Sequence, residues 1–250
     1  MVKSIEMPAY DDFAWFYNRY WSQEFHSAAF PILERIWLPR LKAGARVLDV
    51  CCGTGYLAGL LTERGYRVTG IDESEPMVAF ARENVPSAEF HVARASEFKL
   101  PGRFDGAVST FDSLNHLIGA RSLQAAFQRI AAVLRPGVPF AFDILTPEAY
   151  QTHWGENFAL VRDDHVLVIT GASYDFRSRL ARCTLTMFRL MKGRWQRSDV
   201  VVEEQAYEPS EIDAALERAD FADTACYDAR DLGLAGQLGE GRTFYVATKR

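Results

Sequence analysis

A short glycine-containing loop carries the clearest chemical signal in this 250-residue sequence. It separates an apolar segment, residues 47–50, from an amphipathic segment, residues 56–64, and it holds Gly53 and Gly55. Glycines let a ligand approach the main chain, and the N–H groups at the start of a helix point toward such a ligand. The pattern G-x-G-x-x-A at residues 53–58 therefore fits a dinucleotide-binding loop, although the pattern alone is a weak signal.

Two acidic residues near this loop change the expected ligand. Asp49 stands four residues before Gly53, where its carboxylate would repel the pyrophosphate of a dinucleotide. The same carboxylate attracts S-adenosylmethionine, which carries a sulfonium and an ammonium group. Asp72 ends the next apolar segment, where an acid can bind a ribose diol by two charge-assisted hydrogen bonds. Each acid alone could be a helix or turn cap, but the pair with the glycines between them favours S-adenosylmethionine over a nicotinamide cofactor.

A second group of polar residues follows a later apolar segment, at residues 110–116. If that segment is a strand of a parallel sheet, the group lies at the carboxyl edge, where open α/β sheets bind ligands. His116 is the candidate catalytic residue, because an imidazole can accept a proton near neutral pH or orient the acceptor. It can equally cap or pack against the next helix. Asp112 and Asn115 fit turn and helix-cap roles better, and Asn115 is also a candidate substrate contact.

The composition narrows the class of protein. Hydrophobic residues make up 48% of the chain and charged residues 24%, as in ordinary globular proteins. The net charge of −5 argues against a nucleic-acid partner. The four cysteines show neither a disulfide framework nor metal-ligand spacing, so we expect no metal. No apolar run suits a membrane span or a signal peptide, so we expect a cytoplasmic protein that has no membrane partner.

The periodicity of apolar residues predicts the elements that position these groups. Residues 1–40 are rich in aromatics and are expected to form a helical cap, with Pro31 in a first turn and Pro39 at an end. Strands alternating with helices over residues 41–148, completed by residues 208–250, predict an α/β fold. Its Rossmann-like sheet is seven-stranded and mostly parallel, with helices on both faces. The strands are predicted at 47–50, 67–71, 89–92, 104–109, 138–143, 225–228 and 243–248, and the helices at 56–64, 76–84, 122–134 and 211–219.

Residues 149–207 differ from this core and predict an antiparallel β insert. About three strands are expected, at 166–174, 180–191 and 195–207. The insert is expected to lie on the substrate side or to form an oligomer contact, and its exposed edge could pair two subunits in a homodimer. The insert is also basic, which would suit a phosphorylated or nucleotide-linked acceptor. A solvated face paired with Glu203 and Glu204 is favoured instead. The basic residues are Arg177, Arg179, Arg182, Arg189, Lys192, Arg194 and Arg197.

Four segments in the predicted core carry a family resemblance. Residues 47–55 (VLDVCCGTG), 70–77 (GIDESEPM), 104–108 (FDGAV) and 134–137 (LRPG) resemble, in order and spacing, successive motifs of class I S-adenosylmethionine-dependent methyltransferases. The resemblance implies S-adenosylmethionine as cofactor and S-adenosylhomocysteine as product. It also implies a set of cofactor contacts: Asp49 near the methionine amino group, Gly53 and Gly55 beside the methionine moiety, Asp72 on the ribose and Met77 against the adenine, with Cys51, Glu73 and Thr110 close by.

Two positions depart from the family pattern. Where the family has an acid that accepts a hydrogen bond from the adenine amino group, this chain has Arg94, which cannot accept one. Ala95 would still offer its backbone. The lost bond is expected to weaken adenine recognition by about 1–3 kcal/mol. Val138 replaces the second glycine of a Pro-Gly-Gly turn, a change with structural consequences alone.

A looser resemblance covers most of the chain and concerns the acceptor. Residues 110–116 are similar to a stretch of amino-sugar N-methyltransferases, which share an N-terminal helix and a β insert with glycine N-methyltransferase. This implies a small-molecule acceptor, with an amine nitrogen favoured, and a cofactor contact from Tyr17, although Asn18 replaces the usual Asp. Tyr20, Asn115 and His116 are expected to contact the acceptor. The alternatives are an O-methyltransferase of a small hydroxyl compound, a cofactor-binding protein without methyl transfer and an NAD(P)-dependent oxidoreductase.

Overall fold

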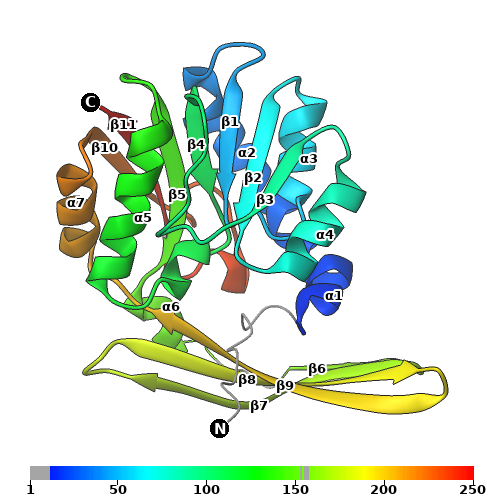
Figure 1. The fold of residues 1–250 in the computed structure, drawn as a ribbon. Helices are drawn as coiled ribbons and strands as arrows, with labels where there is room; N and C mark the ends of the chain where they lie inside the picture. The colour runs from blue at the N-terminus through cyan, green and yellow to red at the C-terminus, as the bar shows by residue number, and fades with distance from the viewer. Residues whose placement is uncertain (1–11, 153, 155–157) are drawn as a thin grey trace, which may run out of the picture.

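The computed structural model describes residues 12–152, 154 and 158–250. Its centre is a seven-stranded sheet with the order β10-β11-β5-β4-β1-β2-β3 (Figure 1). The five strands β1 to β5 are parallel, and β11 runs antiparallel between β5 and β10. The predicted mostly parallel sheet is therefore confirmed. The strands are β1 (Arg46–Val50), β2 (Arg67–Asp72), β3 (Glu89–Val92), β4 (Gly106–Ser109), β5 (Pro139–Leu145), β10 (Phe221–Asp228) and β11 (Arg242–Lys249).

Helices cover both faces of this sheet, which explains why its central strands are almost wholly apolar. The helices α2, α3 and α4 share one core cluster with β1 and β2, and α5 and α7 share the other with β5. All seven residues of β5 are buried between them. The bounds are α2 (Ser22–Ile36), α3 (Tyr56–Glu63), α4 (Glu75–Asn84), α5 (Ala120–Val133) and α7 (Pro209–Arg218).

The N-terminal segment is helical, as predicted, but its proline was assigned wrongly. Three helical segments follow one another: α1 (Ala14–Phe16), a π-helical turn η1 (Tyr17–Trp21) and α2. Pro31 lies inside α2, where it removes one helix hydrogen bond. The buried apolar side chains on both sides of it stabilise the helix despite this loss. Pro39 does stand at an end, in the 3₁₀ turn η2 (Leu38–Arg40). Residues 1–11 of the predicted cap lie outside the described residues.

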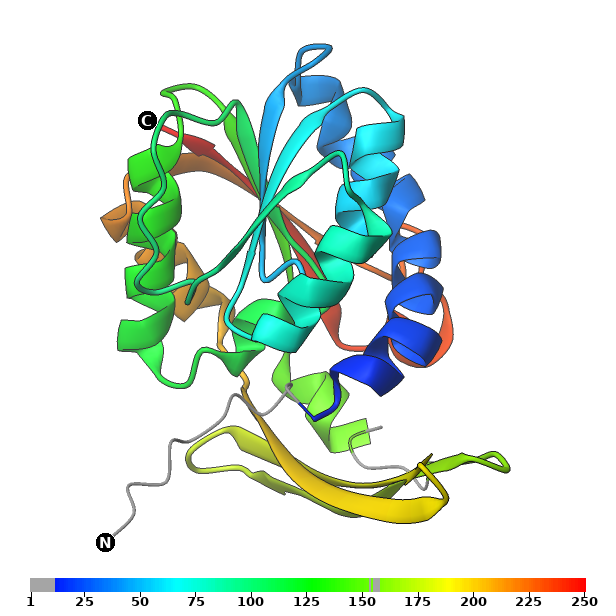
Figure 2. The ribbon, with the colours of Figure 1, turned by 45° about the vertical axis from the view of Figure 1, so that its right-hand side comes forward.

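The insert is a four-stranded antiparallel sheet with the order β6-β7-β8-β9. Its long strands β7 (His165–Asp175), β8 (Leu180–Met191) and β9 (Arg194–Gln205) match the prediction. Two elements too short to show periodicity were not predicted, α6 (Pro147–Thr152) and β6 (Ala159–Val161). Figure 1 and Figure 2 both show the insert crossing beneath the main sheet, at the carboxyl ends of its parallel strands.

The cap and the insert share a core of their own. Phe13 and Phe16 pack with Leu167, Leu185 and other apolar residues of the insert. The two parts together cover the carboxyl edge of the main sheet and leave a space between them and the loops of that edge. Short 3₁₀ turns, η3 (Ser113–His116) and η4 (Gly236–Leu238), complete the described fold. Each helix in the described ranges is too short or too polar to cross a bilayer.

Candidate functional site

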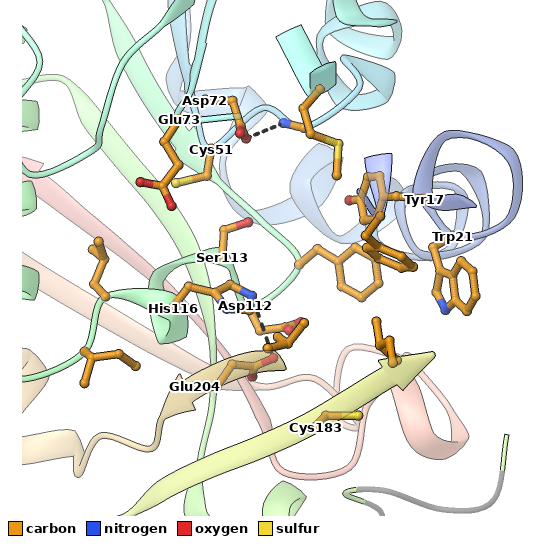
Figure 3. Close-up of a pocket in the computed structure, with 18 of the residues that line it drawn as sticks. Tyr17, Trp21, Cys51, Asp72, Glu73, Asp112, Ser113, His116, Cys183 and Glu204 are labelled. Atoms are coloured by element: carbon orange, nitrogen blue, oxygen red, sulfur yellow. Dashed lines mark hydrogen bonds and ion pairs between the residues drawn. The ribbon is translucent and has the colours of Figure 1, made fainter. Parts of the chain in front are cut away.

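A cavity of about 1000 Å³ lies between the carboxyl edge of the main sheet and the insert (Figure 3). Two regions of it differ in chemistry. The region that we call the cofactor end is lined by the loops after β1, β2 and β3, through Cys51, Gly53, Asp72, Glu73, Met77, Arg94 and Ala95. The region that we call the acceptor end is lined by the loop after β4 and by the insert, through Asp112, Ser113, His116, Glu204 and apolar side chains of β7, β8 and β9.

The loop after β1 needs its glycines for two different reasons. Gly53 has a φ of +52°, and a Cβ there would lie 3.2 Å from a ring carbon of Tyr17. Gly55 has a φ of +82°, and a Cβ there would meet Ala81 at 3.1 Å. Gly53 therefore lets Tyr17 close onto the loop at the cavity, where its cofactor contact stays a prediction. Gly55 does not line the cavity. Its missing side chain instead lets the loop pack closely against α4.

Asp72 is held in place by main-chain donors. The N–H of Gly53 donates to its Oδ2 at 3.0 Å, and the N–H of Ser74 donates to its Oδ1 at 3.0 Å. Burial raises the pKa of Asp72 to about 6, against the opposing effect of these two bonds. At neutral pH the side chain is thus a fixed carboxylate at the cavity, suited to a diol. Met77 is buried beside it and lines the same end.

Asp49 lies beneath the loop rather than in the cavity lining. It is 2% exposed, and among the described residues its Oδ2 has no hydrogen-bond partner. Burial, and then the charge of Asp72, raise its pKa to about 8. A buried acid without a partner is costly unless a cation approaches it. The residues of this end therefore fit a ligand that brings positive charge to the loop, as S-adenosylmethionine does.

Arg94 and its neighbours form the rim of the cofactor end. The Nε of Arg94 pairs with Glu73 at 3.3 Å, and the side chain is 62% exposed. The arginine is therefore neutralised at the surface instead of pointing its charge at a bound base. Ala95 is buried and lines the cavity, where it is expected to replace the missing acid through its backbone.

A strained turn begins the acceptor end. Phe111 and Asp112 have φ values of +64° and +48°, which non-glycine residues rarely adopt. The carboxylate of Asp143 on β5 accepts both of their N–H groups, at 2.7 and 2.9 Å. Arg242 on β11 pairs with Asp143 and, at 2.7 Å, with Asp112. This buried ion network, which was not predicted, fixes the turn that precedes η3.

His116 follows this turn at the end of η3. Its Nδ1–H donates to the carbonyl oxygen of Glu203 at 3.0 Å, so in the neutral ring Nε2 carries the lone pair. Nε2 lies 3.7 Å from Oε1 of Glu204 (Figure 3). Burial lowers the pKa of His116, although the charge of Asp112 opposes this shift. A neutral imidazole that can accept a proton therefore lines the cavity.

Glu204 does not form the surface pair that was predicted for it. It is 4% exposed, it lines the cavity, and Tyr150 donates to its Oε2 at 2.7 Å. Burial, and then the charge of Asp112, raise its pKa. Only its neighbour Glu203 makes the expected surface pair, with Arg182 at 2.6 Å. The alternation of β9 contained this signal, because residue 204 shares a face with the buried Val200 and Val202.

Besides Asp49 and Gly55, three predicted site residues do not line the cavity. The hydroxyl of Tyr20 bonds His165, and that of Thr110 lies 3.2 Å from Nε2 of His26. Asn115 is fully buried and bonds the backbone of Leu145 and Gln205. Their contacts with cofactor or acceptor stay predictions. Asn115 ties η3 to β5 and β9 and so positions the adjacent histidine.

Metal ligation is a further possibility of the acceptor end. One ligand atom each from Asp112, His116 and Glu204 lie within 4.8 Å of one another. Carboxylates and an imidazole in such an arrangement can bind a divalent cation. Two of the carboxylate oxygens already have partners, since Arg242 holds Asp112 and Tyr150 holds Glu204.

Comparison with known proteins supports the ligand inferred for the cofactor end. The sequence profile of the family described as "Methyltransferase domain" matches residues 47–137, which include the loop after β1, Asp72 and the turn that leads to His116. The chain contains a methyltransferase domain. The predicted family and enzyme class, with S-adenosylmethionine as cofactor, are confirmed at the level of this domain.

Two curated relatives match the chain in part. The putative methyltransferase YqeM of Bacillus subtilis is 36% identical over 103 residues, which are 40% of this chain and 42% of that protein. The dTDP-3-amino-3,6-dideoxy-alpha-D-glucopyranose N,N-dimethyltransferase of Streptomyces fradiae is 38% identical over 92 residues, 37% of this chain and 36% of that protein. The chain thus spans less than half the length of these two relatives.

A solved structure extends the likeness to the whole fold. The S-adenosylmethionine-dependent methyltransferase from Clostridium acetobutylicum superposes with a TM-score of 0.77 at 21% identity, covering 97% of this chain and 99% of that chain. The likeness therefore includes the cap and the insert as well as the core. At this level of identity it shows the fold, and the predicted Rossmann-like methyltransferase fold is confirmed.

Proposed function

We propose that this protein transfers a methyl group from S-adenosylmethionine to a nitrogen atom of a small-molecule amine. The observation that carries the proposal is the neutral imidazole of His116, which lines the same cavity as a methyltransferase cofactor loop. A base of this kind suits an acceptor that arrives with a proton to lose. The amino-sugar N,N-dimethyltransferase among the relatives supports nitrogen as the acceptor atom.

The cofactor end would hold the methyl donor through three residues. Asp72 accepts from the ribose hydroxyls, Asp49 attracts the ammonium group through the loop, and Met77 packs against the base. When bound, S-adenosylmethionine supplies a methyl group whose C–S bond breaks as the nitrogen lone pair bonds the carbon, the C–S electrons staying on sulfur. Because this methyl group is already activated, the main task of the protein is to align donor and acceptor.

The acceptor end would prepare the nitrogen. An ammonium ion has no lone pair, so a proton must leave before the new N–C bond forms. The Nε2 of His116 takes that proton, and the bond from Nδ1–H to Glu203 keeps the ring oriented while it carries the charge. The lowered pKa of His116 keeps Nε2 unprotonated at neutral pH and lets the proton pass on to water afterwards.

Methyl transfer from tritiated S-adenosylmethionine to a panel of amines and matching alcohols tests the proposal. His116→Asn should lower kcat for the best amine about 100-fold, while calorimetry finds an unchanged affinity for S-adenosylhomocysteine. His91→Asn is the matched control, since His91 is surface-paired with Glu89. Transfer to alcohols but to no amine would replace the proposal with O-methylation. Failure to bind S-adenosylhomocysteine would reject methyl transfer altogether.

We further propose that the protein is a cytoplasmic homodimer joined through the insert. The long strand β9 is an edge of its sheet and exposes Trp195 and Val201, as expected of a pairing edge. The four cysteines are free, which suits a reducing compartment. Light scattering should give twice the chain mass for the native protein and the chain mass for Val201→Lys. A native monomer would contradict the dimer.

A further inference from the structure

The acceptor end is acidic where the loop after β4 and the end of β5 meet β9 of the insert. Asp112, Asp143 and Glu204 are buried there, and the guanidinium of Arg242 is shared by the first two. In the described part of the chain, Glu204 pairs with no lysine or arginine. The nearest titratable nitrogen that contacts it is Nε2 of His116, at 3.7 Å. Three carboxyl groups thus face one permanent cation. Buried carboxylates in such excess favour a ligand that brings positive charge.

The rest of the acceptor end is an apolar wall. Figure 3 shows Trp21 of the cap on the far side of the cavity from His116, and Cys183 on the insert strand next to that of Glu204. The wall is built by the cap and by the inward face of the insert. It offers surface for hydrophobic burial and few hydrogen-bonding groups. Its side chains are Phe13, Trp21, Phe158, Leu167, Ile169, Cys183, Leu185 and Val202.

The basic residues of the insert do not reach this cavity. Arg179 pairs with Glu208 and Glu211 in the segment after β9, and Arg197 pairs with Asp199. Of the lysines and arginines in the described residues, Arg94 is the one that lines the cavity, and it belongs to the cofactor end. A phosphate or diphosphate at the acceptor end would therefore meet carboxylates and no guanidinium, which is repulsive.

We infer that the acceptor is an amine with an apolar body and without a phosphate or nucleotide group. Its ammonium group binds between Glu204 and Asp112, beside His116, and its body packs on the apolar wall. Glu204 is then the residue that selects an amine over an alcohol of the same shape. This inference rests on the proposed function and narrows it, because it excludes nucleotide-linked amino sugars, the acceptors in the name of the Streptomyces fradiae relative.

The first test measures binding to protein saturated with S-adenosylhomocysteine. Benzylamine, 2-phenylethylamine and octylamine are compared with 2-phenylethanol and thymidine 5′-diphosphate by ligand-observed NMR. At least one amine should bind at millimolar concentration, and the alcohol and the diphosphate should not compete with it. The inference is wrong if no amine binds, or if the diphosphate displaces the amine. Calorimetry with S-adenosylhomocysteine on the same sample separates this failure from failure of the proposed function.

The second test removes the selecting charge. Glu204→Gln keeps the shape and the bond from Tyr150 and should weaken amine binding at least tenfold, with unchanged affinity for S-adenosylhomocysteine. Asp199→Asn on the same strand is the control and should bind the amine as the native protein does. An unchanged amine affinity in Glu204→Gln would overturn the inference. So would a finding that Zn²⁺, added alone, occupies the three side chains and blocks the amine.

Discussion

The two ends of the cavity are built on different principles. The cofactor end uses main-chain groups and two acids from consecutive β-α units, all within residues 49–95. The acceptor end joins residues that are far apart in the chain. They come from the loop after β4 (Asp112), from β5 (Asp143), from β9 (Glu204) and from β11 (Arg242). The first end can be read as one local motif, and the second exists only in the folded protein.

This difference has an energetic side. At the cofactor end, Oδ2 of Asp49 has no hydrogen-bond partner among the described residues, and a bound ligand could supply one. At the acceptor end, Arg242 already pairs with Asp112 and Asp143, and this network holds a strained turn. We therefore expect mutations of the acceptor network to reduce folding stability, and mutations of the cofactor acids to reduce ligand affinity. A buried polar group without a partner raises the free energy of the ligand-free protein, and a ligand that pairs with it binds more tightly for that reason.

Arg242→Met should have the largest effect, because it leaves two buried carboxylates without their cation. The free energy of unfolding should fall by about 3–5 kcal/mol, measured by urea denaturation. Arg230→Met is the matched control, since Arg230 makes two ion pairs at the surface, and little change is expected there. Equal losses in both variants would show that the acceptor network is not a stabilising feature. A triple variant with Asp112→Asn and Asp143→Asn should recover part of the loss.

Asp72→Asn should weaken cofactor binding and leave the free energy of unfolding nearly unchanged. The loss of two charge-assisted bonds is expected to weaken S-adenosylhomocysteine binding about 100-fold at pH 7.5. In the native protein the carboxylate is the binding form and its pKa is about 6, so affinity should fall about tenfold for each pH unit below 6. Calorimetry between pH 5 and 8 measures both effects. The surface variant Asp163→Asn should follow the native curve, and a pH-dependent loss in Asp72→Asn would contradict this assignment.

The same contrast explains which features the sequence could predict. The loop at 47–55 and Asp72 belong to one contiguous pattern, so their chemistry followed from spacing and charge. The long strands β7, β8 and β9 followed from composition. The pairing of Arg242 with Asp112 and Asp143 depends on strand order and on two positive φ angles, which no local pattern records. Glu204 was within reach, because its alternation with Val200 and Val202 placed it on the inner face.

The smallest expected effect concerns Asp49 in the ligand-free protein. The folded state keeps this acid protonated up to about pH 8, whereas an unfolded chain ionises it near pH 4. The folded state therefore binds more protons between these limits, and this contribution to stability falls as the pH rises through them. Between pH 6 and 8 the native protein should lose about 2 kcal/mol relative to Asp49→Asn, or about 4–8 °C in Tm.

Thermal unfolding of the two proteins across this pH range measures the difference, with Asp163→Asn as a control that should parallel the native protein. Saturating S-adenosylhomocysteine should remove the slope, because its ammonium group favours the ionised form of Asp49. Parallel curves for the native protein and Asp49→Asn would mean that this acid is not held for a ligand cation. In that case the contrast between Asp49, whose partner is a ligand cation, and the acids that Arg242 already pairs with would not hold.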